Sequence, residues 1–168
     1  SDLSLEALSH ILVAEMNDDA GSLYIRKHVE TCCNVIRECL NILGDEAKED
    51  AARLLKECLH PLVICDCLEI LGNEAKEDAK RLLKENSDTR VIMTCLMILG
   101  NEAKEDARQL LKSSKAEMLL VVCIYIIGKE AEADAEQLLK TSKKELVRNT
   151  CQELISCWNK SSVNNTAK

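Results

Sequence analysis

Apolar positions along this chain follow a pattern that returns every 28 residues. The clearest copy is the stretch 95–113, CLMILGNEAKEDARQLLKS, in which an apolar run is followed by charged residues and then by leucines. The same pattern begins again at Cys39, Cys67 and Cys123, and a half-copy begins at Cys151. A fixed period of about 20–50 residues is typical of repeat proteins. We refer to the cysteines that open these five copies as the ladder cysteines.

Each copy has the spacing of two short helices. In the third copy, apolar residues at i, i+4 and i+8 predict a first helix over residues 88–99. We expect Gly100 to end that helix in the left-handed conformation and Asn101 to cap the second helix. One face of the second helix then carries Ala103, Ala107, Leu110 and Leu111. Neither helix buries its apolar face alone, so stacking of the copies is expected.

The pattern therefore predicts an all-α fold, a right-handed solenoid of stacked helix-loop-helix repeats with a 28-residue period and atypical terminal caps. Its core should contain Val63, Ile64, Cys67, Ile70, Leu82, Leu83 and their equivalents 28 residues on.

The N-terminal part of the chain departs from the pattern, as terminal repeats do. Leu5, Leu8, Ile11 and Leu12 have the spacing of an apolar helix face, which predicts a helix over residues 5–16. Residues 17–22 have the composition of a loop. Residues 22–43 are predicted to be helical, and the sequence leaves open whether they form one helix or two.

The C-terminal part is also a predicted cap. Arg148 and Gln152 replace apolar residues of earlier copies, as the exposed last layer of a stack requires. We expect a single helical-repeat domain over 1–168. Its parts are an N-terminal cap (1–30), four repeats (31–58, 59–86, 87–114 and 115–142), a C-terminal cap helix (143–160) and a polar tail (161–168).

The copies differ from one another mainly at four positions of the first helix. These positions lie five, two and one residues before the ladder cysteine and two residues after it. Core positions are nearly identical between copies, so the variable positions are expected to face away from the core, on the surface lined by the first helices. An apolar surface with a polar rim is typical of an interaction site. The predicted partner-binding residues are Leu62, Cys65, Glu69, Arg90, Met93, Met97, Met118, Val121, Val122, Tyr125 and Asn149.

Two other interpretations of this surface stay open at this stage. Tight curvature of the solenoid could cover the variable positions and make them core. A second copy of the chain could instead bury them in a homodimer, which would make the protein a self-associating structural scaffold. The difference in variability between core positions and these positions favours a binding surface.

Charge and composition narrow the possible partners. The net charge of −7 disfavours nucleic acid, whose phosphates require a face rich in lysine and arginine. No apolar run approaches 18 residues, so no membrane span is expected. We find no phosphate-binding loop and no catalytic motif, and we expect no enzyme activity, cofactor or small-molecule substrate.

The ten cysteines do not predict a disulfide framework. Stacked helices lie about 9–10 Å apart, whereas a disulfide requires Cα atoms within about 7 Å. The ladder cysteines are better interpreted as small buried hydrophobic residues. Reduced cysteines suit a cytoplasmic location or recombinant expression in a reducing compartment. No metal site is expected, since the three histidines share no spacing with the cysteines.

The near-identity of three consecutive copies, including Gly-Asn/Asp-Glu-Ala-Lys-Glu-Asp-Ala, resembles idealised sequences. The chain from Thr31 to about Trp158 is similar to designed α-helical repeat proteins, artificial relatives of HEAT-type solenoids. That resemblance implies a protein binder whose first helices have been resurfaced. It also implies a partner with an apolar surface or groove, such as a receptor ectodomain of the kind of the Frizzled cysteine-rich domain.

Overall fold

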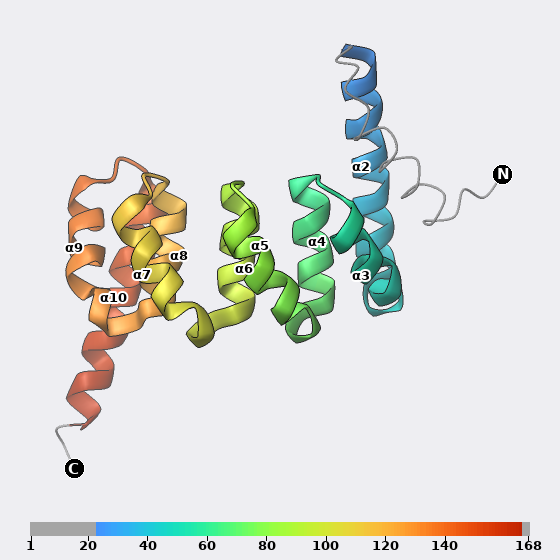
Figure 1. The fold of residues 1–168 in the computed structure, drawn as a ribbon. Helices are drawn as coiled ribbons and strands as arrows, with labels where there is room; N and C mark the ends of the chain where they lie inside the picture. Colours follow the sequence, from blue (N-terminus) through green and yellow to red (C-terminus); the bar gives the residue numbers. More distant parts are fainter. Residues whose placement is uncertain (1–22, 166–168) are drawn as a thin grey trace. The chain divides into compact units, whose positions relative to one another are not determined.

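The structure is a computed structural model that describes the backbone of residues 23–165 and the side chains of residues 29–160. All regular elements of that part are helical, which confirms the predicted all-α class (Figure 1). The α-helices are α2 (Leu23–Leu43), α3 (Lys48–Glu57), α4 (Pro61–Leu71), α5 (Lys76–Glu85), α6 (Thr89–Leu99), α7 (Lys104–Ser113), α8 (Glu117–Ile127), α9 (Glu132–Thr141) and α10 (Glu145–Asn165). Short 3-10 turns join the two helices of each copy: η1 (Gly44–Ala47), η2 (Gly72–Ala75), η3 (Gly100–Ala103) and η4 (Gly128–Ala131). The helix predicted over residues 5–16 lies outside the described residues.

The chain divides into two compact units, one that ends at Ile98 and one that begins at Leu99. In the first unit, α4 packs against both α2 and α3. In the second unit, α8 packs against α7, α9 and α10, and α9 also packs against α10. Helices that are neighbours in sequence therefore pack together within each unit, as in repeat proteins built from helix pairs.

The first and last helices of the described part, α2 and α10, have 21 residues each. α2 is continuous, so of the two arrangements left open by the sequence the single helix is the observed one. α10 runs to Asn165, so the first residues of the predicted polar tail belong to the cap helix. No glycine or proline follows Glu145, and the sequence therefore lacks a residue that would end this helix earlier.

A short side chain marks the junction between one copy and the next. It accepts a hydrogen bond from the backbone N–H two residues further on, and the residues that do so are Cys58, Asn86, Ser114 and Ser142. Such local bonds compete with helix formation and separate the second helix of one copy from the first helix of the next. Glu30 occupies this position in α2, and glutamate favours helix continuation. This difference explains why α2 is not interrupted.

A glycine with positive φ ends each complete first helix, at Gly44, Gly72, Gly100 and Gly128. Gly72 has φ 52° and ψ −122°, which differs from the left-handed helical conformation predicted from the sequence. A Cβ atom at Gly72 would meet nothing within 4 Å, so the requirement for glycine comes from the backbone alone. The predicted cap at Asn101 is wrong, because the η3 turn intervenes and Ala103 takes the capping position of α7.

We expect Gly72→Ala to lower the free energy of unfolding by about 1–3 kcal/mol, because a Cβ atom strains this backbone region. Gly72→Asn should cost a similar amount, since asparagine tolerates the left-handed helical region but not a ψ of −122°. Urea unfolding followed by circular dichroism measures both variants. A tolerated asparagine beside a damaging alanine would show that the turn is left-handed helical in solution.

Buried residues come from one side of each first helix and from small residues of each second helix. The fully buried alanines of the second helices are Ala51, Ala79, Ala107 and Ala135. Their small side chains allow neighbouring helices to approach closely. Of the predicted core residues, those that are buried are Val63, Ile64, Cys67 and Leu82, whereas Ile70 and Leu83 are half-buried.

Candidate binding surface

The predicted partner-binding residues lie on the first helices α4, α6, α8 and α10, but they differ in exposure. Those with exposed side chains are Glu69, Arg90, Met97, Tyr125 and Asn149. Those with half-buried side chains are Leu62, Met93, Met118 and Val122. Cys65 and Val121 are buried, so they do not belong to the exposed surface.

The burial of Cys65 follows from contacts between successive first helices. Arg37 of α2 pairs with Asp66 of α4, with 2.7 Å between Nε and Oδ2. One copy later, Thr94 on α6 lies beside Cys65 on α4 and partly offsets the rise that burial causes in the pKa of the Cys65 thiol. Arg37 and Cys65 each lie two residues before a ladder cysteine. Their partners, Asp66 and Thr94, each lie one residue before the ladder cysteine of the following copy. At these two junctions, the residues that vary between copies therefore lie against each other across neighbouring helices.

Val121 occupies the same position on α8 as Cys65 does on α4. Its helix packs against α10 in the second unit. Only 5% of the Val121 residue is exposed to solvent. Val121, like Cys65, is therefore buried and does not belong to the exposed surface on which the sequence placed it.

The position two residues after the ladder cysteine is exposed in every copy. It holds Asn41, Glu69, Met97, Tyr125 and Glu153. Three of these side chains are polar, whereas Met97 and Tyr125 are large and apolar and are 52% and 56% exposed. This position satisfies the expectation that variable residues face solvent, and it holds the most exposed apolar residues of the predicted set.

The position five residues before the ladder cysteine adds one residue that the sequence-based set omitted. Leu146 at the start of α10 is 64% exposed. Its equivalents Leu62 and Met118 are half-buried, and Arg90 is exposed. Leu146 occupies one of the variable positions, but the other variable positions of its copy hold the polar residues Asn149 and Glu153, which obscure an apolar pattern in the sequence.

Arg90 is held in place at the N-terminus of α6. Its Nε and Nη2 atoms donate to Asp88 at 3.1 and 2.9 Å, and its backbone N–H donates to the same carboxylate at 2.9 Å. The side-chain bond to Arg90 is the main cause that lowers the pKa of Asp88. A carboxylate at this helix end also interacts favourably with the helix dipole. Arg90 is thus an exposed cation whose local partner keeps it close to α6.

Four of the five ladder cysteines line the interior and not the surface. Cys67, Cys95, Cys123 and Cys151 are fully buried, and Cys39 is half-buried. Burial raises the pKa of Cys67 and Cys95 to about 12 and that of Cys123 to about 11. A thiolate, not a thiol, acts as nucleophile and metal ligand. At neutral pH these residues are therefore protonated and behave as small apolar side chains.

We expect Cys157, which is exposed, to react quickly with iodoacetamide in the native protein. Cys67, Cys95 and Cys65 should react only after unfolding, because their thiols are buried and their pKa values are raised. Raising the pH to about 9 should not change that order, since a pKa of about 12 leaves Cys67 protonated. Peptide mass spectrometry after a labelling pulse measures each site. Native labelling of Cys65 at the rate of Cys157 would contradict its burial.

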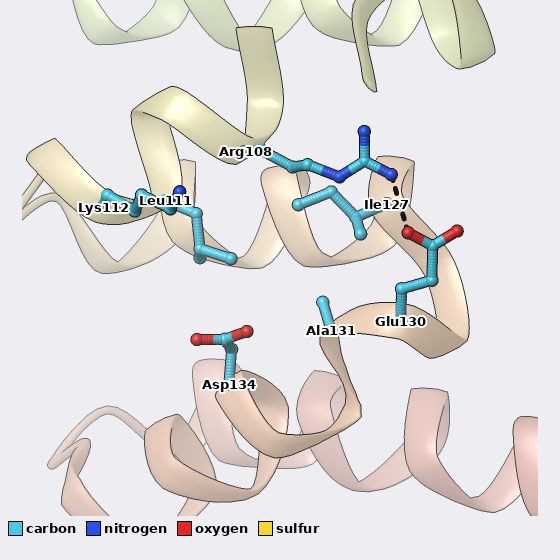
Figure 2. A pocket seen from close by; sticks show the side chains of 7 residues that line it. All are labelled: Arg108, Leu111, Lys112, Ile127, Glu130, Ala131 and Asp134. Carbon is cyan, nitrogen blue, oxygen red and sulfur yellow. Dashed lines mark hydrogen bonds and ion pairs between the residues drawn. The ribbon is translucent and has the colours of Figure 1, made fainter. Parts of the chain in front are cut away.

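A pocket of about 320 Å³ lies in the second unit, away from the variable positions (Figure 2). It is lined by Arg108, Leu111 and Lys112 of α7, Ile127 of α8, Glu130 and Ala131 of η4, and Asp134 of α9. Nη2 of Arg108 donates to Oε2 of Glu130 at 2.6 Å, and Figure 2 shows this pair on one side of the pocket. Its lining contains two cations and two anions but no cysteine, histidine or hydroxyl group.

Among the residues that the structure describes, no group of three or more histidine, cysteine or acidic side chains is placed to hold a metal ion. None of the helices in this part of the chain is both long enough and apolar enough to cross a membrane. No family model, curated protein or solved structure matches the chain.

Proposed function

We propose that this chain is a non-enzymatic protein-binding module that engages a protein partner through the surface lined by its first helices. One observation supports the proposal most directly. The position two residues after the ladder cysteine is exposed in every copy, yet it changes from polar residues to Met97 and Tyr125 in the third and fourth copies. Exposed apolar residues among polar ones are typical of interaction sites. Methionine adapts to different partners, and tyrosine is enriched among residues that dominate binding energy.

The proposal includes the architecture predicted from the sequence, a HEAT-like solenoid with a 28-residue period. Its support is the near-identity of the copies that begin at Cys39, Cys67 and Cys95, together with a glycine-initiated 3-10 turn in each complete copy. We propose that the chain is a designed α-helical repeat protein. Resurfacing the first helices of a regular scaffold would produce this combination of constant core and variable surface.

A self-associating scaffold is the second candidate, because Met97, Tyr125 and Leu146 could equally be covered by another copy of the chain. Sedimentation velocity over a concentration series separates the two functions. A monomer at tens of micromolar supports the binding module. A dimer that Met97→Glu or Tyr125→Ala dissociates would replace it with the scaffold.

Comparative affinity capture tests the binding module. The baits are the parent chain, a Met97→Glu/Tyr125→Ala variant and a Glu105→Ala variant, in which the change lies on the exposed side of α7. We expect a partner that the parent and Glu105→Ala retain and that the double variant loses. A purified receptor ectodomain with an apolar groove, such as a Frizzled cysteine-rich domain, is a reasonable first partner for direct titration. Equal capture by all three baits would refute the proposed surface.

A further inference from the structure

A second pocket, of about 210 Å³, lies beside the pocket of Figure 2 in the second unit. The two pockets share Leu111 of α7 and Asp134 of α9 in their linings. The other residues that line the second pocket are Leu120 and Ile124 of α8 and Gln137, Leu138 and Thr141 of α9. Four of these seven lining residues are apolar, and Asp134 is the one that carries a charge. The second pocket is therefore an apolar space that borders a single carboxylate.

The carboxylate of Asp134 is available to a ligand. Asp134 is exposed, and within the described part of the chain it has no hydrogen-bond or ion-pair partner. Figure 2 shows its carboxylate and the side chain of Leu111 pointing toward each other. The acid on the other side of the Figure 2 pocket differs, because Glu130 is paired with Arg108 at 2.6 Å. Asp134 is thus an anion without a counter-charge beside apolar side chains.

Comparison of the copies explains why Asp134 has no partner. In the first copy, Nη2 of Arg53 lies 3.0 Å from Oδ1 of Asp50, the equivalent aspartate. In the second copy, Arg81 and Asp78 form the same pair at 3.2 Å. Position 137 on α9 is the equivalent of these two arginines, and it holds glutamine, which carries no charge. The fourth copy therefore keeps the aspartate of the earlier copies without the arginine that neutralises it.

The apolar wall of the second pocket is also less covered than its counterpart in the first copy. Leu111 is half-buried, whereas Leu55, at the same position of α3, is only 2% exposed. Ligand pockets usually have volumes of about 300–1,000 Å³, and most of their lining is apolar with a few polar groups that set orientation. The second pocket has such a lining but is smaller, so it suits a small ligand.

We propose that the second pocket binds a small primary amine with an apolar body. The ammonium group contacts the Asp134 carboxylate, and the apolar body lies against Leu111, Leu120 and Leu138. A carboxylate attracts a cation and repels an anion, and apolar walls favour a ligand that transfers apolar surface out of water. This site is separate from the proposed partner-binding surface, because none of the predicted partner-binding residues lines either pocket.

Titration with phenethylamine, which is protonated at neutral pH, tests the proposal in the full chain by two-dimensional amide NMR spectra. We expect the signals of Leu111, Asp134 and Leu138 to shift and to saturate with a Kd of roughly 1 mM, as is usual for a ligand of this size. Phenethyl alcohol has the same apolar body without the charge, and it should bind about three- to fivefold more weakly. Hydrocinnamate, which carries a carboxylate, should bind more weakly still.

Two variants remove the proposed cation contact in different ways. Asp134→Asn deletes the charge and should weaken phenethylamine binding about three- to fivefold, to the level of the alcohol. Gln137→Arg restores the arginine of the earlier copies and should weaken binding by a similar factor, because the new guanidinium competes for Asp134. Glu136→Gln is the matched control, since Glu136 is an exposed acid of α9 that lines neither pocket. It should leave the Kd unchanged.

Three results would overturn the proposal. The first is an equal Kd for phenethylamine and phenethyl alcohol, or for the parent and Asp134→Asn. The second is a set of shifts that spreads over many surface acids and does not saturate. The third concerns Lys112, an exposed cation that lines the Figure 2 pocket. Amine binding that appears only in Lys112→Met would show that this lysine occupies the Asp134 carboxylate in the parent chain.

Discussion

Leu68→Ala is expected to lower the free energy of unfolding by about 2–5 kcal/mol, the usual loss when a fully buried leucine is truncated. Leu68 lies on α4 with no exposed surface, in the helix that packs against both α2 and α3. Removing its side chain deletes buried apolar area and leaves a cavity that surrounding helices fill only in part. Urea unfolding followed by circular dichroism measures the loss.

Leu59→Ala is the matched control, because it makes the same chemical change nine residues earlier in the same unit at an exposed leucine. Its expected cost is below about 0.5 kcal/mol. Comparable losses in the two variants would contradict the burial of Leu68 in the interior. Leu110, which the sequence placed in the core, is half-buried and should give an intermediate loss.

The helices were predictable because apolar spacing follows the geometry of the backbone. Val63, Cys67 and Ile70 follow one another at i, i+4 and i+7, a spacing that a helix places on one side and a strand does not. The end of each first helix was also predictable, because Gly72 and its equivalents interrupt the pattern. The ψ angle of Gly72 was not, since glycine is compatible with several conformations of positive φ.

The candidate surface was predictable only in part, and Cys65 shows why. Variation between copies predicts exposure, and Met97 and Tyr125 are exposed. A position also varies when it contacts another variable position, as Arg37 does with Asp66 and Cys65 with Thr94. Such pairs are visible in a single sequence only after one knows which residues of successive helices are neighbours. Side-chain contacts between helices supply that information, and the 28-residue period alone does not.

Met97→Glu and Tyr125→Ala are each expected to weaken binding to the purified partner by about 2 kcal/mol or more, which is roughly a 30-fold increase in Kd. Binding energy in protein interfaces concentrates in a few large side chains that become fully desolvated. Met97 and Tyr125 are the two large apolar side chains at a position that is exposed in every copy. Glutamate at position 97 would in addition place an unpaired charge in the interface.

Arg90 and Glu69 should behave differently from these two residues, because exposed charges at an interface rim act mainly on association rate. Arg90→Ala is therefore expected to lower the association rate and its dependence on salt, with little change in the dissociation rate. Glu105→Ala, on the exposed side of α7, should leave both rates unchanged. Surface plasmon resonance at two salt concentrations, with circular dichroism of each variant, separates these effects. If Glu105→Ala weakened binding while Met97→Glu and Tyr125→Ala bound as the parent does, the partner would contact the second helices, and the first helices would vary for a reason unrelated to binding.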